Sequence, residues 1–275
     1  MTWIAVHPRC VVAREREWGV LSPDSPASRV ILCVTLVALI ALLVYRAVRK
    51  ERKEYQRFKR FERTKNRQRM LRKWLIDALL TFGGSALVIL LLSWQYITPL
   101  RDATAAWPVG RWFSGLLDDT GALVPGLAAV FAIALVGGTA LAVFLARNSE
   151  NIPTIGDIGA LLPRNRQELA YGAALSINAG VVEELLFRLA VPALIFGALG
   201  NAVVAVASSV LLFALLHVYQ GWPGMIGALV VGALLMSLYL ATGNILVPIV
   251  THALVDLRSL VLIPVLVYRV HATRA

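Results

Sequence analysis

The sequence predicts an all-α fold, a polytopic transmembrane helical bundle, and two observations predict it. Hydrophobic residues make up 58% of the 275 positions and the mean hydropathy is +0.71, whereas soluble domains average about 45–50% apolar residues. Apolar runs of the ~20 residues that a helix needs to cross a bilayer recur along the chain. We count about seven spans, within a range of six to eight. The runs are 30–48, 74–97, 124–145, 170–199, 202–218, 225–242 and 245–268.

The segments between these runs predict the domain organisation. Residues 1–29 form a polar N-terminal tail, and residues 30–73 hold the first span and a basic linker. Further spans occupy 74–160, and residues 269–275 form a basic tail. Residues 161–268 contain every polar motif described below, so we expect them to form the functional domain.

The positive charge is concentrated in the linker 46–73, although the whole chain has a formal charge of +11. Loops rich in Lys and Arg stay on the cytoplasmic side, which places this linker in the cytoplasm. Aromatic residues interleave with the cations, as in some nucleic-acid-binding arms. Because the linker joins two spans directly, we instead expect it to lie on anionic lipid headgroups, and we expect no nucleic acid as partner. The Ala-, Val- and Arg-rich composition is typical of a bacterial cell membrane protein, and two cysteines exclude a disulfide framework.

The first polar cluster is Glu183, Glu184 and Arg188, in an apolar part of the C-terminal half. An ionisable side chain at the centre of a membrane helix costs about 2.5–3.5 kcal/mol, so these three must face a polar cavity within the protein. Glu184 and Arg188 are four residues apart, the spacing of an ion pair on one helical face. Glu183 is then the less neutralised carboxylate and the candidate base.

The second and third clusters each contain a histidine in an apolar run. Phe213 precedes His217 by one helical turn and can pack against its ring, and Asp256 follows His252 by one turn. Asp256 could hold the His252 ring in one tautomer and stabilise its protonated form. Either histidine alone would more often be a hydrogen-bonded packing residue, but together with paired glutamates they indicate a reactive centre.

The three clusters in this order resemble the signature of the CPBP family, which includes type II CAAX prenyl endopeptidases and bacteriocin-processing or immunity proteins. The resemblance covers about residues 160–262. The matching motifs are Glu183-Glu184-x-x-x-Arg188, Phe213-x-x-x-His217 and His252-x-x-x-Asp256, with the lead-in Leu161-Leu162-Pro163-Arg164.

This resemblance implies an intramembrane endopeptidase domain in which Glu183, His217 and His252 are catalytic. Asp256 departs from the Asn that is usual in the prenyl endopeptidases, and an ionised Asp cannot donate a hydrogen bond to an oxyanion. We therefore expect Glu183, helped by His217, to deprotonate a water, and His252 to donate to the oxyanion. Glu184 and Arg188 would fix the geometry, with Asp256 orienting His252. The expected partner is a membrane-associated polypeptide substrate.

No cofactor is certain, and zinc remains open as an alternative. Two histidines and a carboxylate with a free fourth position make a catalytic zinc arrangement, and the ligands would be Glu183, His217 and His252. The H-E-x-x-H helix that would favour zinc is absent. Serine and aspartyl mechanisms fit poorly, because Ser85 has no matching motif and Asp157 falls in a polar loop.

Two alternatives to an enzyme also remain. A non-catalytic membrane binding or immunity protein could retain the same fold, and a proton-coupled transporter could use intramembrane Glu and His residues. One geometric difficulty accompanies the protease interpretation. His217 ends its predicted span and His252 begins its own, although both spans are expected to run in the same direction.

Overall fold

The computed structural model describes residues 25–108 and 156–272, together with short stretches between them. Those stretches are 111, 126, 131, 133, 135–141 and 143–144. All regular elements in the described residues are helices, which confirms the all-α prediction. Part of the predicted span 124–145 and most of the predicted tail 1–29 lie outside the described residues.

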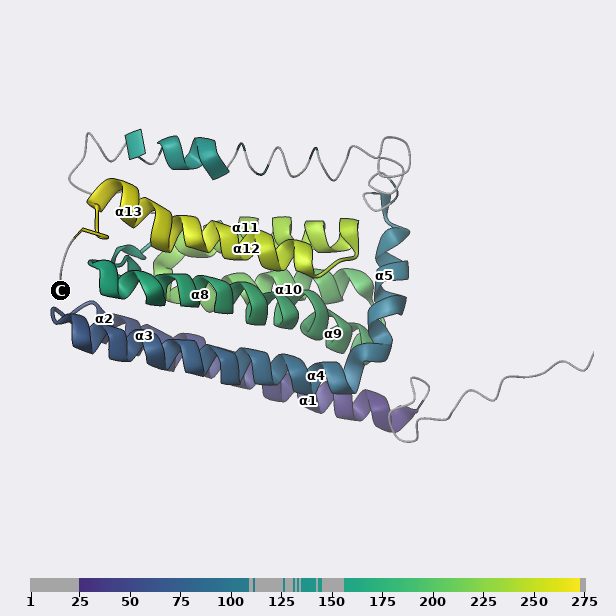
Figure 1. Cartoon of the computed structure of the whole chain (residues 1–275). Coiled ribbons are helices and arrows are strands. Elements are labelled where there is room, and N and C mark those ends of the chain that lie inside the picture. The colour runs from purple at the N-terminus through teal and green to yellow at the C-terminus, as the bar shows by residue number, and fades with distance from the viewer. Residues whose placement is uncertain are drawn as a thin grey trace, which may run out of the picture.

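Two antiparallel helical rods form one side of the bundle (Figure 1). The first rod consists of α1 (Pro26–Tyr45), the π-helical turn η2 (Arg46–Glu51) and α2 (Arg52–Phe58). The second consists of α3 (Thr64–Ala78), the π-helical turn η3 (Leu79–Gly83) and α4 (Gly84–Ser93), and a short turn η4 (Trp94–Tyr96) leads into α5 (Ile97–Ala105). We call the two rods the N-terminal hairpin. Helix α5 crosses the end of the bundle.

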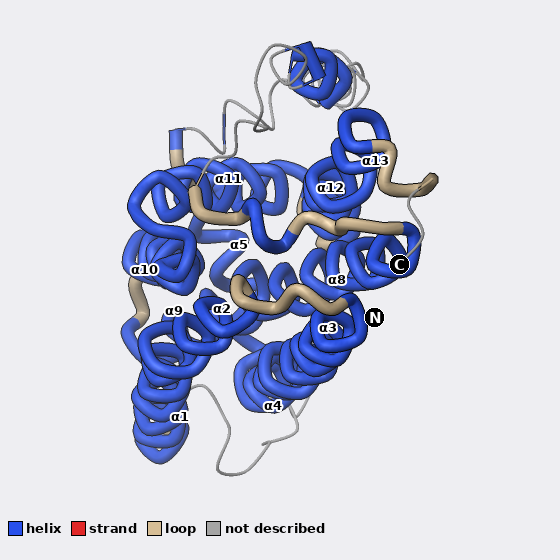
Figure 2. The backbone as a smooth tube through the Cα atoms, turned by 90° about the vertical axis from the view of Figure 1, so that its left-hand side faces the viewer, coloured by secondary structure: helices blue, strands red, loops and turns tan. Residues whose placement is uncertain are grey.

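A long helical segment runs from Arg166 to Leu199 through the middle of the bundle (Figure 2). It consists of α8 (Arg166–Glu184), the π-helical turn η6 (Leu185–Ala190) and α9 (Val191–Leu199), preceded by η5 (Gly159–Leu161). Asn165 caps its start by accepting a hydrogen bond from the backbone N–H of Glu168. Gly200 ends it in the left-handed conformation at φ 68°. Pro192 does not break this segment, because the π-helical turn directly before it lets the helix continue.

The C-terminal part contains three helical segments joined by tight turns. They are α10 (Ala202–Leu216) with η7 (His217–Gln220), α11 (Gly221–Thr242), and α12 (Leu246–Leu257) with η8 (Arg258–Leu262) and α13 (Ile263–Tyr268). Gly221 and Gly243 occupy the turns with φ values of 76° and 63°, which glycine adopts without steric cost. Because the chain reverses twice, α10 and α12 run in the same direction, as the sequence predicted.

Close packing between α8 and α12 depends on two glycines. A Cβ at Gly180 would lie 2.9 Å from Cβ of Ala253, and one at Gly172 would lie 2.8 Å from the carbonyl oxygen of Leu260. Small residues allow membrane helices to approach closely. Since Gly180 is one turn before Glu184 and Ala253 adjoins His252, this contact brings two of the predicted motifs together.

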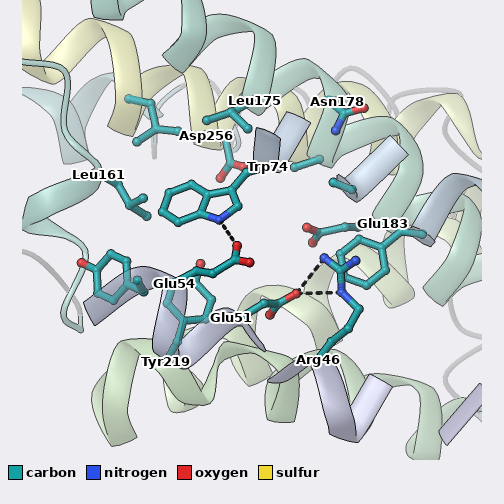
Figure 3. A pocket seen from close by; sticks show the side chains of 15 residues that line it. Arg46, Glu51, Glu54, Trp74, Leu161, Leu175, Asn178, Glu183, Tyr219 and Asp256 are labelled. Atoms are coloured by element: carbon teal, nitrogen blue, oxygen red, sulfur yellow. Dashed lines mark hydrogen bonds and ion pairs between the residues drawn. The ribbon is translucent and has the colours of Figure 1, made fainter. Parts of the chain in front are cut away.

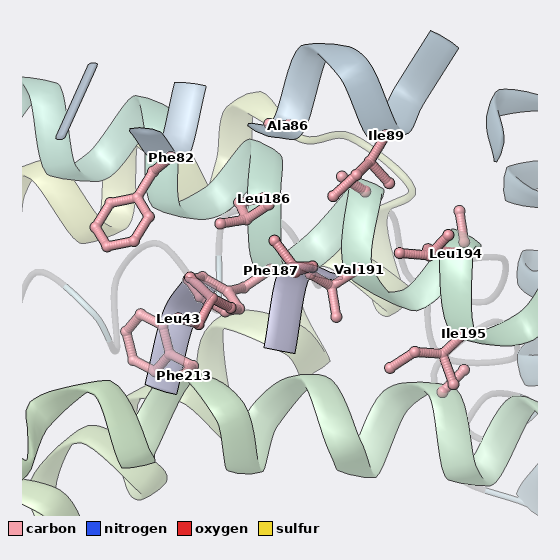
Figure 4. Close-up of a cluster of buried hydrophobic side chains, with 14 of the residues drawn as sticks. Leu43, Phe82, Ala86, Ile89, Leu186, Phe187, Val191, Leu194, Ile195 and Phe213 are labelled. Carbon is pink, nitrogen blue, oxygen red and sulfur yellow. The ribbon is translucent and has the colours of Figure 1, made fainter. Parts of the chain in front are cut away.

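The core is apolar, and so is much of the outer surface. Figure 4 shows the main cluster, in which Leu186, Phe187, Val191 and Leu194 are almost completely buried. Exposed large hydrophobic side chains cover the outside of the rods, as expected for a surface that faces lipid. Among the described residues, four helical stretches are long and apolar enough to cross a membrane by length and composition: Pro26–Phe58, Thr64–Ala105, Ala202–Thr242 and Leu246–Tyr268. The predicted number of seven crossings stays a prediction.

The basic linker is part of the N-terminal hairpin. Its inner face is buried, with Tyr55 and Phe58 almost inaccessible and Arg67 fully enclosed. Arg67 Nε donates to both carboxylate oxygens of Glu168, at 3.0 and 3.1 Å. The outer face carries the exposed cations, and their contact with anionic lipids stays a prediction.

We expect Arg67→Met to destabilise the protein by about 3–5 kcal/mol, because it leaves Glu168 as an uncompensated buried charge between α3 and α8. The double variant Arg67→Met/Glu168→Met should regain part of that loss. Denaturant unfolding in detergent measures both free energies. Arg69→Met, at an exposed position on the same helix, is the matched control. Equal stability of Arg67→Met and Arg69→Met would contradict this role for the ion pair.

Candidate active site

The sequence-predicted site residues come from five helical elements. Glu183 and Glu184 end α8, and Arg188 lies in the π-helical turn that follows. The residues of the other two clusters follow: Phe213 lies in the last turn of α10, His217 at the start of η7, and His252 and Asp256 in α12. A π-helical turn inside an α-helix is frequent at functional sites, and this one lies directly after the two glutamates.

Glu184 connects two of the predicted motifs. Its Oε2 lies 2.9 Å from Nε of Arg188, and both side chains are completely buried. Its Oε1 lies 2.8 Å from Nδ1 of His252, although 68 residues separate the two in sequence. The structure therefore contains the predicted pair with Arg188 and adds a hydrogen bond that the sequence did not predict.

Asp256 lies at ion-pair distance from His252 and makes no direct hydrogen bond to it. Its Oδ2 is 3.7 Å from Nε2 of the ring, which is beyond hydrogen-bonding distance. Glu184 fixes the ring instead, because a carboxylate that accepts from Nδ1–H selects the tautomer and the ring plane. The orienting role of Asp256 stays a prediction, whereas the hydrogen bond from Glu184 comes from another helix, which the i, i+4 rule does not reach.

The tautomer of His217 follows from its backbone partner. Nδ1 lies 2.8 Å from the carbonyl oxygen of Phe213. A carbonyl accepts and never donates, so Nδ1 carries the proton and Nε2 is left with a free lone pair. A nitrogen with a free lone pair can accept a proton from water.

The Phe213 ring joins the two histidines. Its centroid is 4.9 Å from that of His217 and 6.1 Å from that of His252. The guanidinium carbon of Arg188 lies 4.6 Å from the same centroid, a cation–π contact. The expected packing of Phe213 on His217 is present, and the parallel directions of α10 and α12 do not separate the histidines because both rings contact Phe213.

A cavity of about 200 Å³ opens beside Glu183. Figure 3 shows the carboxylates of Glu183, Asp256, Glu51 and Glu54 pointing into it. The last two come from the N-terminal hairpin, with Trp74 donating its indole N–H to Glu54 at 2.8 Å. The hairpin therefore forms one wall of the site.

The net positive charge of the linker does not predict that its helix lines the cavity. A signal was present in the spacing of four residues at i, i+3, i+4 and i+7, the stripe of one helical face. These residues are Glu51, Glu54, Tyr55 and Phe58. Tyr55 and Phe58 are buried, and Glu51, Glu54 and Tyr55 line the cavity.

The zinc alternative finds no support in the geometry. In the described part of the chain, no group of three His, Cys, Asp or Glu side chains is arranged to hold a metal ion. Glu183, His217 and His252 are therefore not arranged as a zinc site.

Comparison with known proteins gives one match. Residues 165–258 match the family model "Type II CAAX prenyl endopeptidase Rce1-like", which is about a third of the chain. No curated protein and no solved structure matches. The matched segment contains all three motifs and lies within the predicted functional domain, so the resemblance seen in the motifs is confirmed. With its apolar helices, the chain is an integral membrane protein, and its residues 165–258 are similar to a type II CAAX prenyl endopeptidase Rce1-like domain.

Proposed function

We propose that this protein is an intramembrane endopeptidase that hydrolyses a peptide bond of a membrane-associated polypeptide through a water activated by Glu183. The observation that carries the proposal is the placement of Glu183 on a cavity lined by several carboxylates, next to a buried network that joins Glu184, Arg188 and His252. The family match supports the same reaction class.

Glu183 is the group best placed to act as the base. It is partly accessible and faces the cavity, whereas Glu184 is fully buried and already bound to two partners. A general base must reach the proton that it removes, directly or through one water. The cavity supplies the space for that water, and Glu183 lines the cavity whereas Glu184 does not.

The two histidines have different roles because their Nδ1 atoms have different partners. His217 donates to a backbone carbonyl, so its free Nε2 assists in removing the proton from water. His252 donates to Glu184, and when its ring is protonated, Nε2–H is the remaining donor for the oxyanion of the tetrahedral intermediate. Glu184 and Arg188 hold this arrangement without contacting the substrate.

The substrate enters from the end of the bundle that carries the basic loop between α2 and α3. Tyr219 of η7 and Tyr55 of α2 meet there, with ring centroids 5.4 Å apart, at the edge of the cavity. The positive-inside rule assigns this end to the cytoplasm, so we expect cleavage close to the cytoplasmic membrane surface. A comparison of a prenylated peptide with an unprenylated one tests whether the substrate carries a prenyl group.

His217→Asn tests the proposal sharply, because an Asn amide can keep the hydrogen bond to the Phe213 carbonyl while lacking Nε2. We expect unchanged folding and a loss of about 10²–10⁴-fold in kcat, the usual contribution of a positioned acid or base. The assay uses purified protein in liposomes with two peptides that end in Cys and three further residues, one prenylated on Cys and one not. Mass spectrometry identifies the products.

The outcomes separate the candidate functions. Cleavage of either peptide by wild type and its loss in His217→Asn support the protease. Equal cleavage by both proteins contradicts the role of His217. Cleavage of neither peptide, together with proton flux across the liposome membrane, would favour the transporter.

A further inference from the structure

Tyr219 is a residue of the cavity to which none of the predicted motifs assigns a role. It lies in η7, two positions after His217, and lines the cavity together with Glu183 and Asp256 (Figure 3). The ring planes of Tyr219 and His217 are nearly parallel, at 25°, with their centroids 6.2 Å apart. The phenol group therefore lies beside one of the two histidines of the proposed reaction.

Neighbouring residues hold the Tyr219 side chain in place. Its ring meets that of Tyr55 edge to face, with centroids 5.4 Å apart and an interplanar angle of 65°. Its hydroxyl oxygen accepts a hydrogen bond of 2.9 Å from the side-chain amide of Gln220. The backbone of η7 is fixed as well, because the carbonyl oxygen of Gln220 accepts from the N–H of Asp157 at 2.8 Å. The hydroxyl group therefore has a defined position before any substrate binds.

The hydroxyl hydrogen of Tyr219 has no acceptor among the described residues. A phenol group can accept a hydrogen bond and donate one at the same time, and Gln220 occupies its accepting side alone. The side chain is partly accessible and lines the cavity. Its O–H can therefore donate to a group that enters the cavity.

Most other donors on the cavity wall already have acceptors. The side chains of Arg46, Trp74 and Tyr55 all donate to partners within the protein. Asn178 gives one N–H to the carbonyl oxygen of Leu75 at 3.3 Å and keeps one. The remaining polar side chains of the wall, apart from the phenol of η7, are carboxylates. Of the described lining residues, this phenol and Asn178 are thus the two uncharged ones with a free donor.

A tetrahedral intermediate in this cavity needs such a donor. Negative charge develops on the former carbonyl oxygen, and the surrounding carboxylates oppose it. His252 supplies a donor when its ring is protonated, because its Nδ1–H is directed to Glu184. A neutral phenol donates in either protonation state of that histidine.

We propose that Tyr219 is a catalytic residue whose hydroxyl donates a hydrogen bond to the oxyanion of the tetrahedral intermediate. The inference rests on the proposed function and adds a second donor to it. Glu183 takes a proton from water, the water oxygen bonds to the carbonyl carbon, and the π electron pair of C=O moves onto the oxygen that Tyr219 contacts. When the intermediate collapses, C=O re-forms, the C–N bond breaks, and the leaving amine takes the proton from Glu183. Tyr219 keeps its own proton throughout.

Tyr219→Phe removes the hydroxyl and keeps the ring that contacts Tyr55 and His217. We expect kcat to fall by about 10²–10³-fold, the usual effect of losing one oxyanion donor. The KM should stay unchanged, because the charge that the hydroxyl stabilises is absent from the bound substrate. The assay uses the full chain in liposomes with the prenylated and unprenylated peptides that end in Cys and three further residues.

Two further variants provide the comparison. Tyr239→Phe is the matched control, because Tyr239 is a buried tyrosine of α11 outside the cavity. Its kcat and KM should both stay near the wild-type values. Asn178→Ala removes the other free donor and should lower kcat less than Tyr219→Phe does.

A phosphinic peptide gives a second measurement that needs no turnover. In this probe –PO2–CH2– replaces the peptide bond after Cys, so negatively charged oxygens lie where the oxyanion forms. Tyr219→Phe should bind the phosphinic peptide more weakly than wild type by about tenfold or more, while the KM for the substrate peptide stays the same. A purely structural defect would instead weaken the binding of both ligands together.

The outcomes separate the inference from the proposed function. If wild type cuts a peptide and Tyr219→Phe keeps its kcat, or binds both ligands equally weakly, the role of Tyr219 is overturned and the protease stands. A larger loss of kcat in Asn178→Ala than in Tyr219→Phe would also overturn it, because Asn178 would then be the donor. Cleavage of neither peptide by wild type would reject the proposed function and the inference together.

Discussion

Glu183→Gln is expected to lower kcat by about 10²–10⁴-fold while leaving the melting temperature in detergent unchanged. The substitution keeps the shape and volume of the side chain but removes its basicity. Glu183 faces the cavity and is partly accessible, so the amide can be solvated there without leaving a buried charge unpaired. Cleavage rates in liposomes and thermal unfolding in detergent measure the two quantities.

Glu54→Gln is the matched control, because it removes a carboxylate from the opposite wall of the same cavity. Its cleavage rate should stay within about tenfold of wild type. Glu54 does not act as the general base, so its loss does not remove the contribution of about 10²–10⁴-fold that a positioned base makes. If Glu54→Gln lost as much activity as Glu183→Gln, the charge of the cavity rather than a specific base would control the reaction.

Glu184→Gln should instead unfold more easily, by about 3–5 kcal/mol, because Arg188 is left as a buried charge without its partner. Turnover should fall as well, since the hydrogen bond that orients His252 loses its charged acceptor. Denaturant unfolding monitored by tryptophan fluorescence gives the free energy, and the liposome assay gives the rate.

The double variant Glu184→Gln/Arg188→Gln distinguishes stability from catalysis. It should recover part of the lost free energy of unfolding, because neither charge remains buried alone, but little of the turnover. A different result would reverse the assignment. If Glu183→Gln were unstable and Glu184→Gln folded normally but were inactive, Glu184 would be the base and Glu183 the structural partner.

Hydropathy predicted the helical segments better than their ends. The predicted span 245–268 agrees closely with the run from α12 to α13, whereas 74–97 starts ten residues after the first residue of α3. An apolar run marks only the part of a helix that can lie in the hydrocarbon core. The helix itself can extend further, into polar residues, as long as its backbone hydrogen bonds continue. The π-helical turns had no sequence signal that we recognised.

Site contacts were predictable where they were local. The pair of Glu184 with Arg188 and the contact of Phe213 with His217 follow from helical periodicity. The hydrogen bond from His252 to Glu184 joins α12 to α8, so it depends on helix packing that one sequence does not reveal. The wall contributed by the hairpin was missed for the same reason.

The central claim is that this protein cuts a polypeptide with Glu183, and the most direct measurement is mass spectrometry of new chain ends. Membranes that contain the wild-type protein are compared with membranes that contain Glu183→Gln at equal abundance. A Glu183-dependent peptidase predicts polypeptide ends that appear with wild type and are absent with Glu183→Gln. Identical sets of chain ends in the two membranes would contradict it.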